Sequence, residues 1–370
     1  MALLRAALVA LACLCASSLA AQDSINSAVR VKQGDRLVDL ASQLVKINTQ
    51  FVFENTGSEA ARFVLLAVDE THKHSLAYIN ALLVEPNKGG VKPLKLVETM
   101  VKGHEKSGHL FYRAELKTPL TTGKAVTITL ECIHTHYLEA FPREISQKEK
   151  QLVKYSGNHY ILSPYTVLKQ KTTVNLSARN VENYTKLKPV TQTDMTLNYG
   201  TYENIPGFSY DAMVIHCENN TPFLTVRNLQ RHIEVSHWGN IAIEETVDLE
   251  HTGAILKGSF SRYEFQRESG SGLSSVKSFK TILPASATDA YYRDDIGNIS
   301  TSNMKVMSDA VELNLRPRFP LFGGWKTHYV IGYNVPSYEY LYNSGDDYVL
   351  KIRFIDHIFD DMIVDDAVSR

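Results

Sequence analysis

The sequence predicts a mostly β protein with two tandem antiparallel β-sandwich-like domains, the second of them incomplete at its carboxyl end. Three observations support this prediction. Short segments of alternating apolar and polar residues recur along the chain and are separated by Gly, Pro, Asn and Asp. Tyr and Phe, which favour strands, number 19 and 14. Similar segments also follow one another in the same order in the two halves of the chain, as in a tandem duplication.

The 370-residue chain is long enough for two domains, and its composition excludes several classes of protein. Lys and Arg total 39 against 40 Asp and Glu, so the formal net charge of −1 gives no basic surface for nucleic acid. Hydrophobic residues make up 44% and charged residues 21%, which is globular composition and excludes disorder and a coiled coil.

Residues 1–21 have the features of a cleaved secretory signal peptide. A positive charge at Arg5 precedes an apolar stretch over 6–16, and small residues follow at 17–21, where signal peptidase cuts. Beyond it, no run of eighteen apolar residues predicts a transmembrane helix, and the chain ends in Val368-Ser369-Arg370 without a retrieval signal. We therefore expect retention in the secretory pathway to depend on a partner or on further sequence.

The duplication is read from three pairs of segments. Residues 45–54 and 241–250 both alternate apolar and polar side chains and run into a turn that contains glycine. The later pairs are 119–123 with 320–324 and 156–162 with 344–350.

The repeat predicts a first domain over 22–230 and a second over 231–370. Much more chain follows the last matching segment in the first domain than in the second. A sandwich without its last strands would leave an exposed edge. We therefore expect that the natural protein extends past Arg370 or that this copy is truncated.

Two pairs of histidines are candidate metal ligands. His104 and His109 lie five residues apart with a glycine between them, whereas a helical zinc motif needs a spacing of four, so a solvated loop is expected. His134 and His136 lie two apart on a predicted strand and would share one face of it. Apolar residues on that face favour partly buried histidines over a zinc site, and no third ligand is evident.

The paired carboxylates do not predict a glycosidase site. Neighbours on a strand point to opposite faces, whereas a glycosidase needs two carboxylates facing each other across a cleft. We expect turns and solvated edges for these pairs, which are Asp294-Asp295, Asp360-Asp361 and Asp365-Asp366. A serine nucleophile elbow, a phosphate-binding loop and a Cys-x-x-Cys pair are all missing from the sequence, which thus predicts no catalytic residue, cofactor or metal.

Four Asn-x-Ser/Thr triplets are candidate N-glycosylation sites, at Asn175, Asn183, Asn219 and Asn298. Asn298 lies in a polar, turn-like run where a glycan would meet solvent, whereas Asn175 alternates within a predicted strand. We expect glycans at one or two of the four, with Asn298 the foremost candidate.

Two cysteines remain after removal of the signal, Cys132 and Cys217, both in predicted strands. They form either one disulfide or two buried thiols. A disulfide requires Cα atoms within about 7 Å, a distance that the sequence does not provide.

Trp238 and Trp325 are the two tryptophans, and tyrosines that include Tyr329 and Tyr338 crowd the region of the second. Core packing is one interpretation of these residues. The other is a surface that binds a partner protein, because Trp and Tyr are frequent at the centres of interfaces.

Five long segments carry a family resemblance: 157–165, 177–187, 236–241, 319–329 and 332–341. They closely resemble ribophorin I, the family of the large luminal subunit of the endoplasmic reticulum oligosaccharyltransferase, and the resemblance covers nearly the whole mature chain. It implies two luminal β-rich domains of a type I membrane protein, whose transmembrane helix and cytosolic tail do not follow in this sequence.

The resemblance implies a supporting role. In the family, the complex transfers a preassembled oligosaccharide from dolichyl diphosphate to Asn-x-Ser/Thr of nascent proteins, and a different, multi-spanning subunit holds the metal and carries the reaction. The chain is then expected in the endoplasmic reticulum lumen as a membrane-associated, non-catalytic subunit. Its expected partners are the other subunits, including the catalytic one, and nascent polypeptide. The Asn298 triplet resembles a glycan site of the family.

Two other classes of function remain open. A free luminal or secreted glycan-binding or adhesion module would bind glycans or cells without other subunits. A secreted hydrolase would need convergent polar groups in a pocket.

Overall fold

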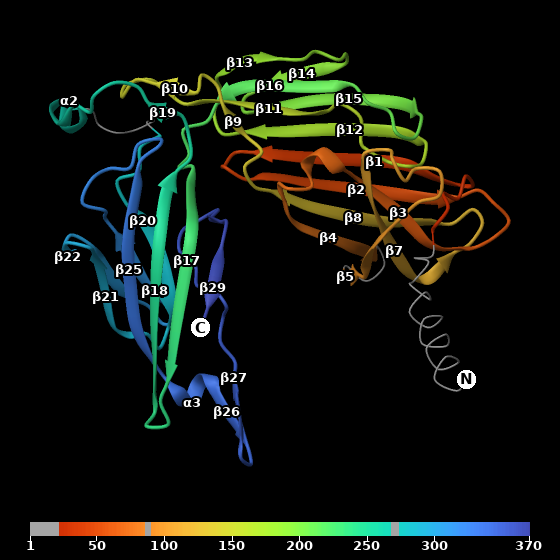
Figure 1. Cartoon of the computed structure of the whole chain (residues 1–370). Helices are drawn as coiled ribbons and strands as arrows, with labels where there is room; N and C mark the ends of the chain where they lie inside the picture. Colours follow the sequence, from red (N-terminus) through yellow and green to blue (C-terminus); the bar gives the residue numbers. More distant parts are fainter. Residues whose placement is uncertain (1–21, 86–89, 268–273) are drawn as a thin grey trace, which may run out of the picture.

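The computed structural model describes residues 22–85, 90–267 and 274–370, which form several β-sheets (Figure 1). The helices among them are short: η1 (Glu70–His72), α2 (Arg262–Arg267) and α3 (Ser337–Tyr340). The prediction of a mostly β protein is confirmed. Within these ranges, no helix has the length and apolar character needed to span a membrane.

An eight-stranded sheet forms the centre of the amino-terminal half. Its middle strands bury alternate side chains, because apolar residues there alternate with polar ones. The order of its strands is β14 (Val190–Thr193), β15 (Thr196–Ile205), β12 (Val167–Leu176), β1 (Val29–Leu40), β2 (Val45–Asn55), β8 (Ala125–His134), β4 (Leu76–Glu85) and β5 (Gly90–Leu94).

Two smaller sheets complete the amino-terminal half. The first has the order β13 (Val181–Tyr184), β16 (Ala212–Glu218), β11 (Leu152–Asn158) and β9 (Glu139–Ala140). The second has the order β3 (Ala61–Asp69), β7 (His109–Leu120) and β6 (Leu96–Thr99). Side chains of all three sheets meet in one hydrophobic cluster drawn from residues 29–223.

The carboxyl-terminal half is built around one larger sheet. Its strand order is β22 (Gly297–Asn298), β21 (Thr288–Asp294), β25 (Lys326–Pro336), β18 (Asn240–His251), β17 (Leu224–Val235) and β28 (Ile363–Val364), and β29 (Ala367–Ser369) also pairs with β17. A smaller sheet has the order β20 (Phe279–Pro284), β24 (Ala310–Leu315) and β23 (Asn303–Val306), and β26 (Leu341–Ser344) pairs with β27 (Asp347–Leu350). Buried side chains from residues 224–359 form a second hydrophobic cluster.

The two halves repeat one arrangement of strands. The order β1-β2-β8 in the first sheet corresponds to β17-β18-β25 in the second, and the first strand of each trio has an irregular register near its start. On its other side, each of these first strands pairs in parallel with a later strand, β12 beside β1 and then β28 and β29 beside β17. The parallel pairs depart from the antiparallel prediction, because alternation along one strand does not report the direction of its neighbour.

Along the chain, the first hydrophobic cluster ends at Phe223 and the second begins at Leu224. The boundary predicted near residue 230 would fall inside β17. We therefore call residues 22–223 the first unit and residues 224–370 the second unit.

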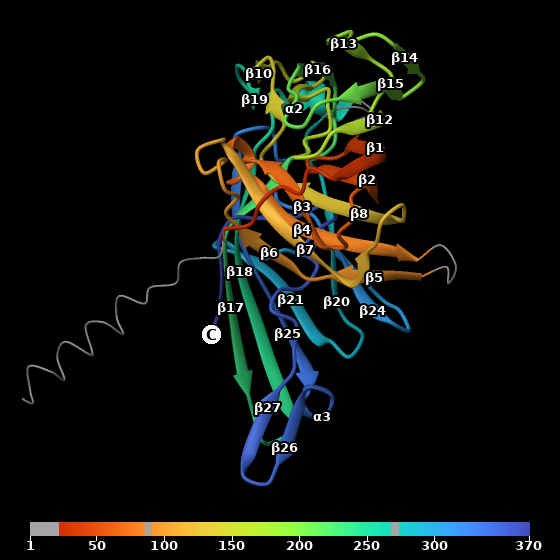
Figure 2. The same ribbon diagram turned by 90° about the vertical axis from the view of Figure 1, so that its right-hand side faces the viewer.

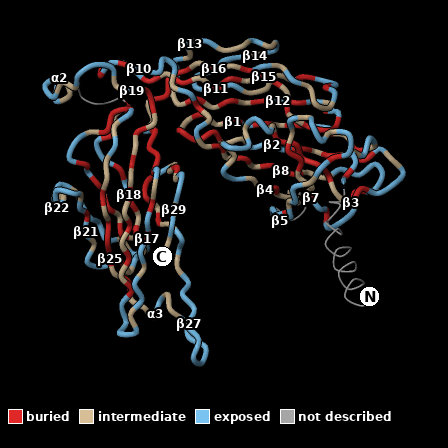
Figure 3. The backbone as a smooth tube through the Cα atoms, viewed as in Figure 1, coloured by how far each residue is buried: buried red, intermediate tan, exposed pale blue. Residues whose placement is uncertain are grey.

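The long strands of the second unit run at a steep angle to those of the first unit in both views (Figures 1 and 2). The units meet where β10 (Glu144–Ile145) pairs in parallel with β19 (Ile255–Leu256). The buried side chain of Gln43 adds hydrogen bonds from Nε2 to the carbonyl oxygens of Leu224, at 2.8 Å, and Asp361, at 2.7 Å. Figure 3 shows buried segments along the inner strands of both units and an exposed end around β27.

Candidate functional site

The first pair of histidines packs against an aromatic ring. His104 lies before β7 and His109 begins it, and their rings stack on Phe208 with centroid distances of 4.6 and 5.4 Å. The described residues contain no group of three or more His, Cys, Asp or Glu side chains placed to hold a metal ion.

The second pair of histidines is split between two environments. His134 ends β8 and is buried, whereas His136 lies beyond the strand with a φ of 52°. His136 Nε2 lies 2.7 Å from Asp365 Oδ1 of the second unit. The prediction that both histidines share one strand face is wrong, because the strand ends before His136.

Carboxylates from all three pairs form ion pairs. Arg318 Nη2 donates to Asp294 Oδ1 at 2.9 Å, and the hydrogen bonds from this guanidinium lower the pKa of Asp294 to about 2. Lys46 of the first unit donates to Asp361 of the second at 2.6 Å. Asp360 Oδ1 lies 3.0 Å from a histidine imidazole. These pairs serve structure, and the Asp361 pair links the two units.

The four candidate glycosylation sites differ in accessibility. Asn298 and Asn183 are exposed, and Asn175 is half-buried in β12. Asn219 is fully buried, and its side-chain nitrogen donates to the carbonyl oxygen of Leu40 at 3.2 Å. A glycan on Asn219 would replace an amide hydrogen and need space that the fold does not provide, so this site is incompatible with the folded chain.

The two cysteines are buried free thiols in different sheets, Cys132 in β8 and Cys217 in β16. Of the two alternatives, the structure therefore has the thiols and not the disulfide. Burial raises the pKa of Cys132 to about 12 and that of Cys217 to about 11. Both stay protonated at neutral pH, and neither acts as a thiolate nucleophile.

α3, β26, β27 and the turn between β17 and β18 lie at the end of the second unit away from the first unit (Figure 1), and they carry exposed aromatic side chains. Trp238, in the turn between β17 and β18, is 98% exposed, and Tyr338 of α3 is 79% exposed. This turn contacts β27, since the rings of His237 and Tyr348 lie 4.8 Å apart. We call this surface the aromatic end and define it by Trp238, Tyr338, Tyr342 and Tyr348.

Two of the aromatic residues predicted for an interface lie elsewhere. Tyr329 is fully buried in the core of the second unit, so it is not available to a partner. Trp325 is half-buried, with its ring 5.6 Å from Phe260 and 5.4 Å from Phe322. Core packing, one of the two interpretations, therefore describes these residues.

A cavity of about 530 Å³ opens in the first unit. The strands β1, β2 and β8 of the large sheet line it, and β3, η1, β7, β11 and the loops at 160–162 and 208–210 contribute further residues. Its apolar lining includes Phe51, Ala67, Leu130, Cys132, Ile161 and Phe208. A largely apolar cavity of this size is typical of sites for small molecules.

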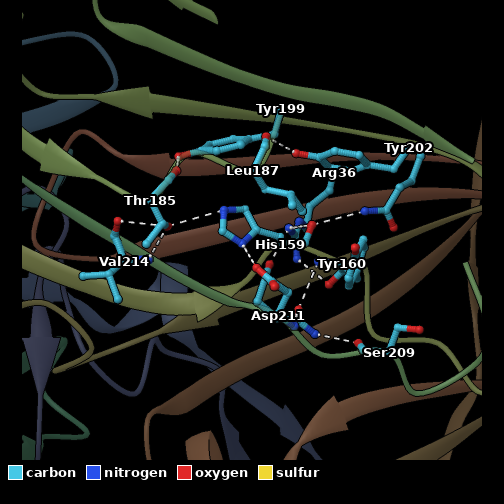
Figure 4. A network of polar contacts seen from close by, with 12 residues as sticks. Arg36, His159, Tyr160, Thr185, Leu187, Tyr199, Tyr202, Ser209, Asp211 and Val214 are labelled. Atoms are coloured by element: carbon cyan, nitrogen blue, oxygen red, sulfur yellow. Dashed lines mark hydrogen bonds and ion pairs between the residues drawn. The ribbon is translucent and has the colours of Figure 1, made fainter. Parts of the chain in front are cut away.

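Arg36 of β1 lines this cavity and is buried (Figure 4). Its Nη2 donates to the carbonyl oxygens of Asn158, at 2.7 Å, and His159, at 3.0 Å. Its Nη1 donates to the carbonyl oxygen of Tyr160, and its Nε to Thr172 Oγ1, both at 3.2 Å. Burial lowers the pKa of Arg36, but a guanidinium remains charged at neutral pH.

A second set of contacts holds the segment that Arg36 binds (Figure 4). His159 Nδ1 lies 2.7 Å from Asp211 Oδ1, and the hydroxyl of Thr185 lies 3.4 Å from His159 Nε2. Tyr199 Oη donates to the carbonyl oxygen of Thr185 at 3.1 Å. These contacts fix the wall of the cavity in one position.

The polar groups near His134 do not form a catalytic pair. Ser75 Oγ donates its single hydrogen to the carbonyl oxygen of His72 at 2.8 Å, so its 3.1 Å contact with His134 Nδ1 places the proton on that nitrogen. Burial, with a smaller contribution from His72, lowers the pKa of His134 to about 4. The imidazole is neutral at pH 7 and takes no proton from Ser75.

Sequence reasoning did not identify Arg36 or the cavity. The available signal was the position of Arg36, which falls on the inward side of the alternation in β1. A charged residue at an inward position indicates a buried polar contact. The cavity gave no such signal, because it depends on how three sheets pack.

Comparisons with known proteins agree with the family resemblance. The family model described as Ribophorin I matches residues 29–370. The chain is 43% identical over 333 residues to "Dolichyl-diphosphooligosaccharide--protein glycosyltransferase subunit 1" of Caenorhabditis elegans, covering 90% of this chain and 56% of that protein. It is 38% identical over 344 residues to subunit 1B of Arabidopsis thaliana, covering 92% of this chain and 73% of that protein. The chain therefore spans about half the length of the nematode relative.

Solved structures give only a weak likeness. A two-domain M1 zinc metallopeptidase matches 57% of this chain and 45% of its own with 12% identity and a TM-score of 0.30, which is too low to indicate a shared fold or function. The family match is much stronger than the structural one. It extends from β1 to the end of the second unit, and more than a third of the aligned residues are identical in the relatives that support it. The chain belongs to the Ribophorin I family.

Proposed function

We propose that this chain is a non-catalytic subunit of the endoplasmic reticulum oligosaccharyltransferase. In that complex, oligosaccharide passes from dolichyl diphosphate to Asn-x-Ser/Thr of nascent proteins, and another, multi-spanning subunit carries the reaction. The observation behind the proposal is the 43% identity over 333 residues to a relative named as subunit 1 of this glycosyltransferase. The proposed location is the lumen, in association with the membrane.

The proposed contribution of the chain is to hold other components in place. A support of this kind raises the effective concentration of a reactant near an active site if its own shape is fixed. The junction between the units favours a fixed shape, because it combines the β10–β19 pair with the buried Gln43 and the Lys46–Asp361 ion pair.

The aromatic end is the proposed surface for another subunit. Large exposed aromatic side chains are costly to leave in water, and Trp and Tyr often supply most of the binding energy at interfaces. Trp238 and Tyr338 are the most exposed of them, and the contact of the β17–β18 turn with β27 holds this surface together.

Affinity purification tests the proposal. A tagged chain is expressed in cells and purified from detergent-solubilised membranes, and the eluate is assayed for transfer of oligosaccharide to an acceptor peptide. We expect transferase activity to co-purify with the wild-type chain and to fall about tenfold for Trp238→Ala with Tyr338→Ala, as expected for interface anchors.

Tyr263→Ala is the matched control. Tyr263 is 67% exposed and belongs to α2, near the opposite end of the second unit (Figure 1), so its removal should leave co-purification unchanged. A lone wild-type chain without transferase activity would overturn the proposed function and favour a free glycan-binding or adhesion module. Equal recovery with all variants would leave the subunit role intact but exclude the aromatic end as the interface.

A further inference from the structure

The duplication allows the same position to be compared in both units. In the first unit, Arg36 of β1 pairs with Thr49 of β2, which pairs with Leu130 of β8. In the second unit, Arg231 of β17 pairs with Glu245 of β18. Because the strand trios correspond, Arg36 and Arg231 are equivalent, and so are Thr49 and Glu245.

The charge of Arg231 is neutralised within the protein. Its Nη1 donates to Asp356 Oδ2 at 2.8 Å and also to a carboxylate oxygen of Glu245, and its Nη2 lies 3.2 Å from Tyr333 Oη. All four side chains are buried. The space around this arginine is therefore filled by its own counter-ions and a tyrosine.

The equivalent position in the first unit lacks these groups. Thr49 stands where the second unit has Glu245, and Cys132, which pairs with Ile47, stands where the second unit has Tyr333, which pairs with Ile243. A hydroxyl and a thiol replace a carboxylate and a phenol. The 530 Å³ cavity lies at this place, and both Thr49 and Cys132 line it.

Arg36 keeps a positive charge against this cavity. Four of the five guanidinium N–H groups donate to three carbonyl oxygens and a hydroxyl, which leaves one N–H for a ligand. The four hydrogen-bond partners of Arg36 are neutral groups. Within the described residues, Arg36 forms no ion pair with a carboxylate.

The other ionisable groups of the lining do not form an ion pair or hydrogen bond with Arg36. Asp69 accepts hydrogen bonds from the backbone N and the Oγ1 of Thr71, at 2.9 and 2.7 Å, and caps η1. His72, His109 and His134 also line the cavity, and the buried Nδ1 of His109 has no hydrogen-bond partner within the described structure. The lining therefore combines an apolar surface with the cation of Arg36, the carboxylate of Asp69, which forms no ion pair with Arg36, and an unsatisfied imidazole nitrogen.

We propose that this cavity binds a small molecule with an apolar or aromatic body and one carboxylate group, which lies against Arg36. A carboxylate suits the site better than a phosphate, because a single free N–H matches one anionic oxygen better than the three of a phosphate. The apolar lining covers the body, as in other small-molecule sites. The proposal goes beyond the subunit role and does not depend on it.

Two acid and amide pairs test the proposal on the full chain by isothermal titration calorimetry. The probes are 4-phenylbutyrate with 4-phenylbutanamide and octanoate with octanamide, each pair having the same body with and without the charge. We expect at least one acid to bind with a dissociation constant of about 2 mM or tighter, typical of ligands of this size. Its amide should bind about tenfold more weakly, because it loses a charged hydrogen bond.

Variants reproduce the second unit in the first. Thr49→Glu supplies the carboxylate that Glu245 provides to Arg231, and Cys132→Tyr supplies the phenol of Tyr333. Ala67→Leu also fills part of the cavity, with a side chain smaller than tyrosine, and serves as a second variant if Cys132→Tyr does not fold. Each folded variant, verified by circular dichroism, should lose at least about tenfold in affinity for the acid.

The control is Thr191→Glu, which places the same charge on an exposed position of β14 and should bind the acid as the wild type does. Equal affinity for acid and amide would overturn the role of Arg36. Wild-type affinity in both folded Thr49→Glu and Ala67→Leu would exclude this cavity as the site. Failure of both acids to bind the wild-type chain would refute the proposal as a whole.

Discussion

Replacement of Arg231 by methionine should destabilise the second unit strongly. Arg231 is 2% exposed and, among the residues that the structure describes, is the only cation paired with Glu245 and Asp356, which are each 1% exposed. Methionine keeps most of the volume but leaves both carboxylates buried without a counter-ion, and Asp356 keeps only the hydrogen bond from the Tyr333 hydroxyl. One of them would have to take up a proton or draw water into the core.

The expected loss in the free energy of unfolding is about 3 to 5 kcal/mol, the usual cost of removing one partner from a buried ion pair. For a unit of this size, that corresponds to a melting midpoint lower by roughly 6 to 20 °C. Arg227→Met is the matched control, because Arg227 lies on the same strand and pairs with Glu250 and Asp365 at the surface. Its replacement should cost less than about 1 kcal/mol.

Urea unfolding followed by tryptophan fluorescence measures this loss. Both tryptophans belong to the second unit, and the change in emission comes from Trp325, which packs against the core of that unit, because Trp238 is 98% exposed. Far-ultraviolet circular dichroism follows both units in parallel. If Arg231→Met and Arg227→Met shifted the fluorescence transition equally, or if Arg231→Met stayed within about 1 kcal/mol of the wild type, the buried cluster would not stabilise the fold as argued.

Three further predictions concern protonation and modification. The pKa of His134 is about 4 in the folded chain and about 6.5 in the unfolded chain, so protonation of this histidine favours unfolding. The free energy of unfolding should be unaffected by this group above pH 6.5 and fall by about 3 kcal/mol as the pH drops to 4. Denaturant unfolding between these pH values should show this slope, and His134→Gln should reduce it. Arg318→Gln should raise the pKa of Asp294 from about 2 toward its usual range in a carboxyl NMR titration, and the stabilising effect of this ion pair should be lost as the pH falls toward 2. Asn298→Gln should remove one endoglycosidase-sensitive step in mobility on a gel, whereas Asn219→Gln should change no glycan; loss of a glycan with Asn219→Gln would contradict the burial argument.

Much of the fold could be predicted from alternation. The segment 45–54 became β2 and the segment 241–250 became β18, because side chains on the apolar side of each are buried in a core. The duplication is also visible, since these two strands hold the same place between their neighbours. Local pattern suffices here, because a strand with one buried face requires period two.

What the sequence could not provide depends on contacts between distant segments. His136 continues the pattern of His134 in sequence, yet the strand ends between them and His136 reaches the second unit. Tyr329 and Tyr338 look alike in sequence, but one is in the core and the other on the surface. The cavity exists because Thr49 and Cys132 are smaller than the residues at the equivalent positions of the second unit, a glutamate and a tyrosine. This difference can be seen only when the strands of the two units are aligned by their register.

The parallel strand in each unit affects how the chain can fold while it is being made. Val31 of β1 can pair with Val167 of β12 only after about 140 further residues have been synthesised. The separation between Thr225 of β17 and Ile363 of β28 is about the same. At about 5 to 20 residues per second, the open edge of each first strand remains unpaired for about 7 to 28 s. Newly synthesised chains should therefore bind chaperones in two periods, the first ending once β12 can pair with β1 and the second once β28 can pair with β17.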